Sequence, residues 1–381
     1  MIDAFSALKQ KTELLCKGLF LDEELIPHYK NQGIEIDYGR RGGAGPYGGR
    51  YFLLEDNTTL VNVALWNIPG RTNLALKENR DGFFKVVNED KKDFFGKLKL
   101  IQNPVYYDPK FKTSDGTPMK KVALVHGINC LASTIYQKCA YWACGEACTF
   151  CGIEVSLNSN TTILEKNAQQ ISEVISAAKK ENRCKHMTLT SGTEETTDKG
   201  ANRYIELLKG VKEQHPDVPL HVQIEALEDL EYIAKLKEAG ADTIGIHIEV
   251  LNDSIRRDIT PGKYHLSYSL FEKNWKKALE IFGPNQVSSY ILAGFGEKTA
   301  DFLDDIEKVI SLGVIPYLTP VRSVPGKKNL PKVNYKNMLK IYLKVGELMK
   351  TYGVNPLKSK AGCVKCGGCS AINEAFKHLK T

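Results

Sequence analysis

Residues 131–154 read LASTIYQKCAYWACGEACTFCGIE, and this stretch decides how the rest of the chain is interpreted. It opens with a short run, 131–137, whose apolar and β-branched residues are typical of a strand. Three cysteines then follow closely, Cys144, Cys148 and Cys151, with the spacing C-x3-C-x2-C. Because α/β folds place their chemistry in the loops at the carboxyl ends of strands, the pattern predicts a functional loop directly after a first strand.

The same alternation of a short strand and an amphipathic stretch continues from about residue 121 onward. The predicted strands lie at 131–137, 186–191, 220–227, 242–250, 287–294 and 314–321, and a last helix lies at 334–353. Six β–α units in succession predict a parallel sheet, and six is short of the eight of a complete barrel. We therefore expect an α/β fold built on a partial (β/α)6 TIM-like barrel.

Three regions are expected along the chain. Residues 1–120 form an N-terminal α+β extension, 121–325 the partial barrel, and 326–381 a C-terminal helix with an auxiliary iron–sulfur segment. Within the extension, residues 50–65 predict a hairpin turning at Asp56-Asn57, whereas 77–99 are too charged to be expected in the core. The glycine-rich stretch 39–50 is predicted to be a lid or partner-docking loop, with a phosphate cradle using Arg40 and Arg41 as the alternative.

Composition excludes several classes of protein. The chain has 381 residues, 42% of them hydrophobic and 25% charged, which excludes disordered, collagen-like and coiled-coil proteins. Its net charge of +7 suits an anionic partner, but a nucleic-acid-binding protein would carry a denser basic patch. The first twenty residues lack the apolar region of a secretory signal, and the longest uncharged run, 122–137, is too short and polar to span a bilayer. We expect a cytoplasmic protein without a membrane or nucleic-acid partner.

The first cysteine set favours an iron–sulfur cluster over zinc. Three thiolates from one tight loop can hold three irons of a [4Fe–4S] cube, which leaves the fourth iron open to a small molecule. Phe150, just before the last cysteine, can place its ring against a bound base. Structural zinc sites usually use two C-x2-C pairs and fill all four positions, so zinc and incidental cysteines are the weaker alternatives.

This motif with its aromatic residue resembles that of the radical S-adenosylmethionine (SAM) superfamily, and its surroundings resemble lipoyl synthases and, less closely, biotin synthases. The similarity covers about residues 125–325, including LTSGTEETTDKGANRY (189–204) and GIHIEVLNDSIRRDITPGKY (245–264). It implies that the open iron of a [4Fe–4S] cluster chelates SAM. It also implies that an electron from a reductant such as ferredoxin or flavodoxin cleaves SAM to methionine and a 5′-deoxyadenosyl radical.

The resemblance further implies which residues contact SAM. Strand ends and the loops after them supply polar groups, a guanidinium pairs with the SAM carboxylate, and glycines let the backbone approach the adenine. The alternative for each residue is ordinary barrel structure. The expected contacts are Phe150, Thr190, Ser191, Gly192, Glu194, Gln223, Glu225, His247 and Glu249 (on one face of the fourth strand), Arg257, Gly294 and Gly296.

A second cysteine set, Cys363, Cys366 and Cys369, has the spacing C-x2-C-x2-C, which begins like a bacterial ferredoxin run. The position of the fourth ferredoxin cysteine holds Asn373 instead. We expect these three residues to bind an auxiliary [4Fe–4S] cluster, with a zinc or iron site and redox-active thiols as alternatives.

The fourth ligand of that cluster is open. Lipoyl synthases of the common type carry an N-terminal cysteine motif and a C-terminal Arg-Ser-Ser-Tyr serine ligand, and this chain has neither. Arg322, Ser323 and Ser370 are the candidates. The departure makes the chain most similar to the two-protein (type 2) class of lipoyl synthase, which implies a second radical SAM subunit as a partner.

The leading functional hypothesis is therefore a radical SAM sulfurtransferase. It inserts sulfur from the auxiliary cluster into an octanoyl chain held on a lipoyl-carrier protein. The alternative within enzymes is a radical SAM dehydrogenase or peptide-modifying enzyme that uses the auxiliary cluster for electron transfer or substrate anchoring. The alternative outside enzymes is an iron–sulfur assembly or electron-carrier protein.

Overall fold

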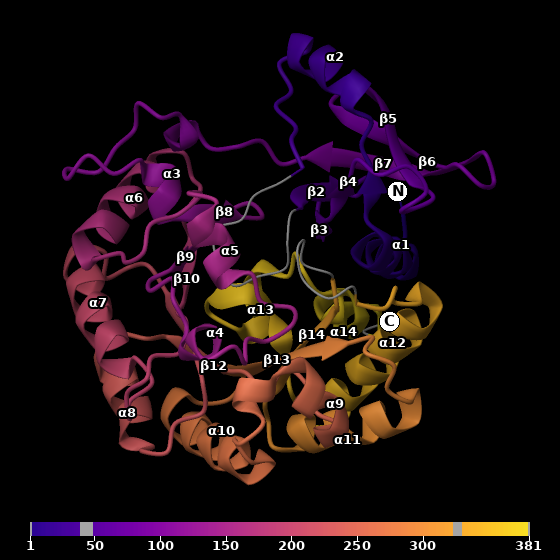
Figure 1. Ribbon diagram of the computed structural model, residues 1–381. Helices are drawn as coiled ribbons and strands as arrows, with labels where there is room; N and C mark the ends of the chain where they lie inside the picture. Colours follow the sequence, from indigo (N-terminus) through magenta and orange to yellow (C-terminus); the bar gives the residue numbers. More distant parts are fainter. Residues whose placement is uncertain (1, 39–48, 323–329, 380–381) are drawn as a thin grey trace.

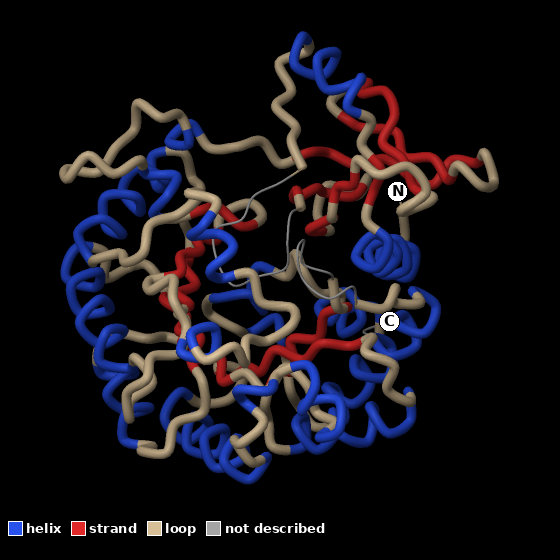
Figure 2. Tube along the Cα trace, viewed as in Figure 1, coloured by secondary structure: helices blue, strands red, loops and turns tan. Residues whose placement is uncertain are grey.

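The computed structural model describes residues 2–38, 49–322 and 330–379, which contain two seven-stranded sheets. The second sheet, in the order β14-β13-β12-β11-β10-β9-β8, curls around a central space with helices on its outer side (Figure 1). The first sheet, in the order β3-β2-β7-β6-β5-β1-β4, lies beside the open side of that curve (Figure 2).

The curled sheet contains six parallel strands, as the sequence predicts. They are β9 (Cys130–Thr134), β10 (His186–Thr190), β11 (Leu220–Ile224), β12 (Thr243–Ile246), β13 (Val287–Ala293) and β14 (Ile315–Pro320). A short strand that the sequence did not predict, β8 (Leu124–His126), pairs antiparallel with β9 at one edge. The α/β partial-barrel prediction is confirmed, but the fourth strand ends at Ile246, so His247 and Glu249 lie in the loop after it rather than on a strand face.

Amphipathic helices cover the outer face of this sheet (Figure 1). The long ones are α6 (Ala168–Lys180), α7 (Ala201–Gln214), α8 (Glu231–Glu238), α10 (Tyr268–Phe282) and α11 (Thr299–Ser311). Short helices lie in the connecting segments: α3 (Met119–Val122), α4 (Ala140–Ala143), α5 (Ile153–Asn158) and α9 (Asp253–Ile259). In α6, Ile171, Val174 and Ile175 are fully buried, as their helical spacing predicts. That helix begins at Ala168 rather than near 163, because Asn167 and Gln170 form a capping box at its start.

Helix α1 (Ala4–Lys17) precedes the N-terminal sheet in the chain. Helix α2 (Ile26–Asn31) lies in the connection between the first two strands of that sheet. Its strands are β1 (Leu19–Phe20), β2 (Arg50–Leu54), β3 (Leu60–Val63), β4 (Leu65–Trp66), β5 (Leu74–Arg80), β6 (Phe83–Asn88) and β7 (Asp93–Leu100). The predicted hairpin is confirmed, since β2 and β3 pair antiparallel. The prediction that 77–99 lies outside the core is wrong. Phe84, Val86 and Leu98 are buried, because charged residues alternate with apolar ones along β6 and β7.

The C-terminal residues return to the centre of the molecule. Helix α12 (Tyr335–Thr351) packs on α11 and α1, and the short α13 (Gly362–Cys366) lies inside the curled sheet against β10, β11 and β14 (Figure 1). Helix α14 (Ile372–His378) packs between α12 and α1. The predicted glycine-rich loop at 39–48 lies outside the described residues. Within the described part of the chain, every helix is too short or too polar to cross a lipid bilayer.

Candidate functional site

One cavity of about 340 Å³ opens inside the curled sheet, and both cysteine sets reach it. Cys148 and Cys151 of the first set line it together with Phe150, and all three cysteines of the second set line it as well: Cys363, Cys366 and Cys369. The cavity therefore joins two segments that lie more than 200 residues apart in the sequence. Among the described residues, no three His, Cys, Asp or Glu side chains converge on a position for a single metal ion.

The first cysteine loop is held at both ends by hydrogen bonds. Gln137 donates from Nε2 to the Ile153 carbonyl at 2.9 Å, which ties the start of the loop to the start of α5. Within the loop, the Thr149 amide donates to the Ile259 carbonyl at 2.9 Å. Cys148 is buried, which raises the pKa of its thiol, whereas Cys144 is exposed and lies outside the cavity lining. The loop therefore has a fixed frame with one thiol at the surface.

A buried ion pair lies beside this loop. Lys263 donates from Nζ to Oε1 of Glu249 at 2.7 Å, and both side chains are nearly enclosed. Burial disfavours the ammonium, but the acidic groups around it, Glu249 first, outweigh this effect and raise the pKa of Lys263. Glu249 has φ of +57°, an uncommon backbone conformation for a residue other than glycine. Such strain is typical of functional sites.

Two polar atoms in this part of the cavity have no hydrogen-bond partner among the described residues. They are Oε2 of Glu249 and Nε2 of His247. Nδ1 of His247 already accepts from the Tyr290 amide at 3.0 Å, which fixes the ring. Because a buried polar atom without a partner is costly, these two atoms indicate a place for a polar ligand.

Glu225 is held in place from two sides. Its Oε1 accepts from the Tyr141 hydroxyl at 2.8 Å, and its Oε2 accepts from the Thr193 hydroxyl at 3.1 Å. Tyr141 belongs to α4, directly before the first cysteine set, so this bond connects the cysteine loop to the end of β11. The carboxylate therefore orients the loop and faces the cavity at the same time.

The structure brings most of the expected SAM contacts to the cavity. Those that line it are Phe150, Thr190, Ser191, Gly192, Gln223, Glu225, His247 and Glu249. Those outside the lining are Glu194, Arg257, Gly294 and Gly296.

The residues outside the lining have other partners or surroundings. Glu194 binds Nε and Nη2 of Arg203 at 2.6 and 3.1 Å, and Arg257 is exposed and donates to the Tyr264 hydroxyl at 3.2 Å. The Gly294 amide donates to Glu297 at 2.6 Å, and a Cβ at Gly294 would lie 2.4 Å from a methyl of Val333. A Cβ at Gly296 would have no neighbour within 4 Å.

The second cysteine set lies on the inner side of the barrel. The Gly362 amide donates to Nδ1 of His186 at 3.2 Å, and a Cβ at Gly362 would lie 2.4 Å from the ring of His221, so only glycine fits there. Gln223 approaches Cys363 with Nε2 at 3.5 Å from the sulfur. Burial raises the pKa of Cys363 to about 12, so its proton must leave when a metal binds.

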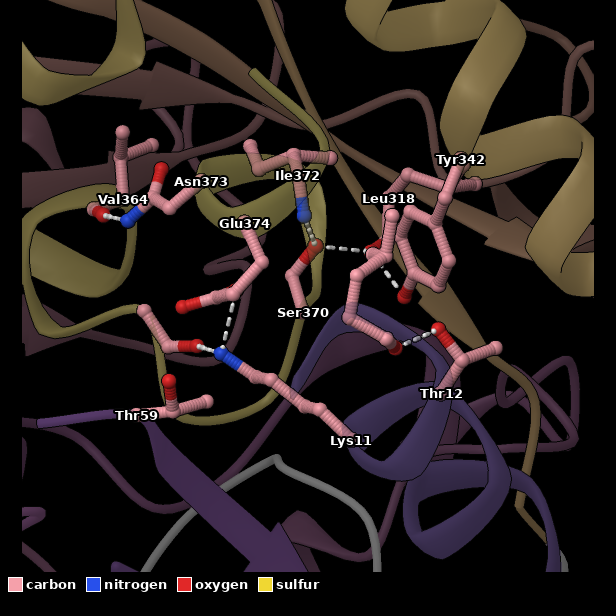
Figure 3. A network of polar contacts seen from close by, with 12 residues as sticks. Lys11, Thr12, Thr59, Leu318, Tyr342, Val364, Ser370, Ile372, Asn373 and Glu374 are labelled. Carbon is pink, nitrogen blue, oxygen red and sulfur yellow. Dashed lines mark hydrogen bonds and ion pairs between the residues drawn. The ribbon is translucent and has the colours of Figure 1, made fainter. Parts of the chain in front are cut away.

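The N-terminal region holds the other side of this loop, as Figure 3 shows. Lys11 is fully buried and donates from Nζ to the Gly367 carbonyl at 2.8 Å and to Glu374 at 2.7 Å. The Asn62 amide donates to the Gly368 carbonyl at 2.7 Å. The Tyr51 hydroxyl lies 3.8 Å from the sulfur of Cys369. The first sheet is therefore part of the wall around the second cysteine set.

The candidates for a fourth ligand of this set are engaged elsewhere or not described. Ser370 donates to the Leu318 carbonyl and accepts from the Ile372 amide (Figure 3). Asn373 donates from Nδ2 to the Val364 carbonyl at 2.9 Å, and its buried Oδ1 has no partner among the described residues. Arg322 donates to Asn62 Oδ1 and O and to the Leu15 carbonyl. Ser323 lies outside the described residues.

Several cavity residues were missed by the sequence analysis. Tyr290 and Tyr317 pair across β13 and β14 and both line the cavity. Alternation along these strands could have identified them, because the inward positions of a strand recur every second residue. Lys263 and Tyr141 gave no such signal, because a lysine in a turn and a tyrosine in a short helix are usually exposed or structural.

Residues 143–309 match the family model described as the Radical SAM superfamily. The chain contains a radical SAM domain. Its three loop cysteines are the donors that an iron–sulfur cluster takes, and the unpartnered atoms of Glu249 and His247 leave polar groups free for SAM. The residues present therefore fit both an iron–sulfur cluster and SAM.

The curated relatives are named lipoyl synthases. One from Treponema denticola is 26% identical over 220 residues, which cover 53% of this chain and 69% of the relative. One from Bacillus cereus is 23% identical over 194 residues, covering 50% of this chain and 62% of the relative. One from Haemophilus influenzae is matched over 58% of its length. This chain thus spans only about three-fifths to two-thirds of the relatives it matches.

Two solved structures are similar to this chain in part. A radical SAM methyltransferase from Sphaerobacter thermophilus is 13% identical, with a TM-score of 0.45 and coverage of 74% of this chain and 76% of that one. Methylornithine synthase is 19% identical, with a TM-score of 0.45 and coverage of 59% of this chain and 63% of that one.

Proposed function

We propose that this chain is a radical SAM sulfurtransferase that inserts sulfur into an octanoyl chain carried on a lipoyl-carrier protein. One observation carries the proposal: both cysteine sets line the same cavity. A carbon atom of a substrate held there would have SAM on one side and a source of sulfide on the other. The named lipoyl synthases among the relatives support the same reaction.

The first cysteine loop lines the part of the cavity where SAM would bind and be cleaved. Cys144, Cys148 and Cys151 would hold the [4Fe–4S] cluster, which together with SAM supplies a 5′-deoxyadenosyl radical when both are bound. Glu249 offers Oε2 as a free acceptor; burial raises the pKa of this carboxyl, while Lys263 opposes that rise and fixes the group in place. Glu249 is therefore suited to accept from an amino or hydroxyl group of SAM.

The middle of the cavity suits an unbranched acyl chain. Its wall includes Leu124, Val125, Ile224 and Leu292, which offer no charge and exclude water. Tyr290 and Tyr317 add large ring surfaces to the same lining. An aliphatic chain has no polar group for recognition, so shape and apolar contact must position the carbon that loses hydrogen.

The second cysteine loop is the proposed source of sulfur. Cys363, Cys366 and Cys369 would hold the auxiliary [4Fe–4S] cluster, and their loop is fixed by Lys11 and Asn62 from the N-terminal region. The net charge of +7 favours an acidic carrier domain through electrostatic steering. A small electron-transfer protein such as ferredoxin or flavodoxin, and a second radical SAM subunit, are the other proposed partners.

An alternative radical SAM function has its own support. Tyr51, Tyr290 and Tyr317 surround the second cysteine set with ring surface, which would shield a cluster from consumption. A shielded cluster suits electron transfer or substrate anchoring in a dehydrogenase or peptide-modifying enzyme. The two functions differ in whether the auxiliary cluster loses sulfide during turnover.

The test uses the full chain, reconstituted anaerobically with iron and sulfide, together with SAM, a reductant and an octanoyl-lysyl carrier peptide. We expect two clusters per chain, release of 5′-deoxyadenosine and a peptide heavier by one sulfur. Cys366→Ala should keep SAM cleavage and lose the sulfur gain, whereas Cys148→Ala should lose both. SAM cleavage without any change in peptide mass would overturn sulfur insertion and favour the alternative function.

A further inference from the structure

A fourth buried thiol meets the second cysteine set from the barrel wall. Cys130, the first residue of β9, is 1% exposed, and its thiol donates to the Leu131 carbonyl at 3.5 Å. It lies with Cys366 in the lining of a second cavity, which has a volume of about 580 Å³. Cys130 is 233 positions from Cys363 in the sequence, so spacing alone gave no reason to group it with the C-terminal set.

The backbone around Cys130 fixes this approach. Cys130 pairs with His126 across the β8–β9 hairpin, and the turn between them brings Gly127 so close that a Cβ there would lie 3.3 Å from the Cys366 sulfur. Cys130 also pairs with His186 across β9 and β10. His186 accepts the Gly362 amide at 3.2 Å. Cys130 and His186, the first residues of β9 and β10, therefore lie side by side, and His186 binds the first residue of α13.

The other polar candidates are less suited to the position. Ser370 donates to the Leu318 carbonyl, and Asn373 donates from Nδ2 to the Val364 carbonyl. The buried Oδ1 of Asn373 has no partner among the described residues, but a carbonyl oxygen is a harder ligand than the thiolates that iron–sulfur clusters select. The three guanidinium nitrogens of Arg322 donate to the Leu15 carbonyl, to Oδ1 of Asn62 and to the Asn62 carbonyl. Among the side chains of the described residues, Cys130 brings a thiol into contact with a sulfur of the C-terminal set.

We infer that Cys130 is the fourth protein ligand of the auxiliary cluster, which gives the set Cys130, Cys363, Cys366 and Cys369. This inference rests on the proposed function, in which the 363–369 loop binds a [4Fe–4S] cluster. Four cysteines are the usual complement of such a cluster. Three ligands come from one loop and the fourth from a strand of the sheet, so Cys130 anchors the cluster to the barrel itself.

The test isolates the auxiliary site. In full-length protein carrying Cys144→Ala, Cys148→Ala and Cys151→Ala, anaerobic reconstitution should give about four irons per chain. Adding Cys130→Ala should lower the iron content and yield, after oxidation, the EPR signal of a three-iron cluster. Adding Cys184→Ala is the matched control, because Cys184 is also buried and lines the same second cavity. That control should keep the iron content and the spectrum of the parent.

A conservative variant guards against a folding defect. Cys130→Ser keeps the volume of the side chain and offers oxygen as a weaker ligand. It should restore four irons with a shifted EPR spectrum and midpoint potential. If Cys130→Ala and Cys130→Ser match the Cys184→Ala control in iron, spectrum and potential, the inference is overturned. His126 lines both cavities and is the rival fourth ligand. If His126→Gln lowers the iron content and neither Cys130 variant does, the inference that Cys130 is the ligand is overturned as well.

The same series separates this inference from the proposed function. If Cys363→Ala, Cys366→Ala and Cys369→Ala together leave the auxiliary iron in place, the auxiliary cluster proposal itself fails. If those three substitutions remove the iron while the Cys130 variants leave it unchanged, the cluster stands and only its fourth ligand is wrong.

Discussion

Lys263 and Glu249 form an ion pair of 2.7 Å inside the protein, although they belong to different turns of the region after β12. Lys263 ends the short 3-10 helix η3 (Pro261–Lys263), and Glu249 occupies a backbone conformation that few residues other than glycine adopt. The pair joins the loop after β12 to the wall of the first cysteine loop, because the Gly262 amide donates to the Glu146 carbonyl at 3.2 Å.

Removing only the lysine should be worse than removing the whole pair. Lys263→Met leaves the Glu249 carboxylate buried without its cation, which typically costs about 3–5 kcal/mol of unfolding free energy. The double variant Lys263→Met with Glu249→Gln removes the charge and should recover much of that loss. Urea unfolding of the apoproteins measures both. Equal stability of the single and double variants would contradict a buried, charge-paired Glu249.

A second buried pair fixes the auxiliary loop. Lys11→Met should lower the unfolding free energy by about 3–5 kcal/mol, because it leaves Glu374 unpaired and the Gly367 carbonyl without a donor. It should also reduce iron bound by the second cysteine set while sparing the first. Lys17→Met is the matched control, since Lys17 pairs with Glu13 at 2.6 Å but is partly exposed. That control should cost under about 1 kcal/mol. Similar losses in the two variants would count against the role of Lys11.

Acid should destabilise the apoprotein through its buried histidines. Burial, with a smaller contribution from the charge of His186, lowers the pKa of His221 to about 3. An unfolded histidine titrates near 6.5, so below that pH the unfolded chain binds the proton first and stability falls as pH falls toward 3. The loss from His221 alone should be about 2 kcal/mol by pH 5. Urea unfolding at several pH values should show a shallower decline for His221→Gln; parallel curves for the two proteins would contradict it.

The end of β10 should tolerate no side chain at Gly192. A Cβ there would lie 1.8 Å from the Lys138 carbonyl oxygen, which belongs to the backbone entering the first cysteine loop. Gly192→Ala should therefore displace that loop and reduce the iron and SAM bound by the first site several-fold. Gly96→Ala is the control, because its Cβ would meet only the flexible end of Gln10 at 3.4 Å. Normal iron and SAM binding by Gly192→Ala would show that the loop adapts without loss.

The sequence predicted the six parallel strands because each is a short β-branched run followed by an amphipathic stretch. It also located both cysteine sets, since their spacing is local. It missed Lys263 and Cys130, whose roles depend on contacts between residues far apart in the chain. It misjudged 77–99, where exposed charges such as Lys85 and Lys97 mask buried neighbours on the opposite face. Pairings across the fold, such as Lys11 with Glu374, leave no local pattern.

The position of α13 inside the curled sheet has a consequence for the order of biosynthesis. Residues 362–369 are translated after every strand that surrounds them, yet they contact β10, β11 and β14 in the finished protein. The strands of the barrel therefore emerge from the ribosome before the segment that fills the space between them, and the first cysteine loop emerges before the second. Maturation of the two sites should be sequential, with the C-terminal loop entering last and closing the interior behind it.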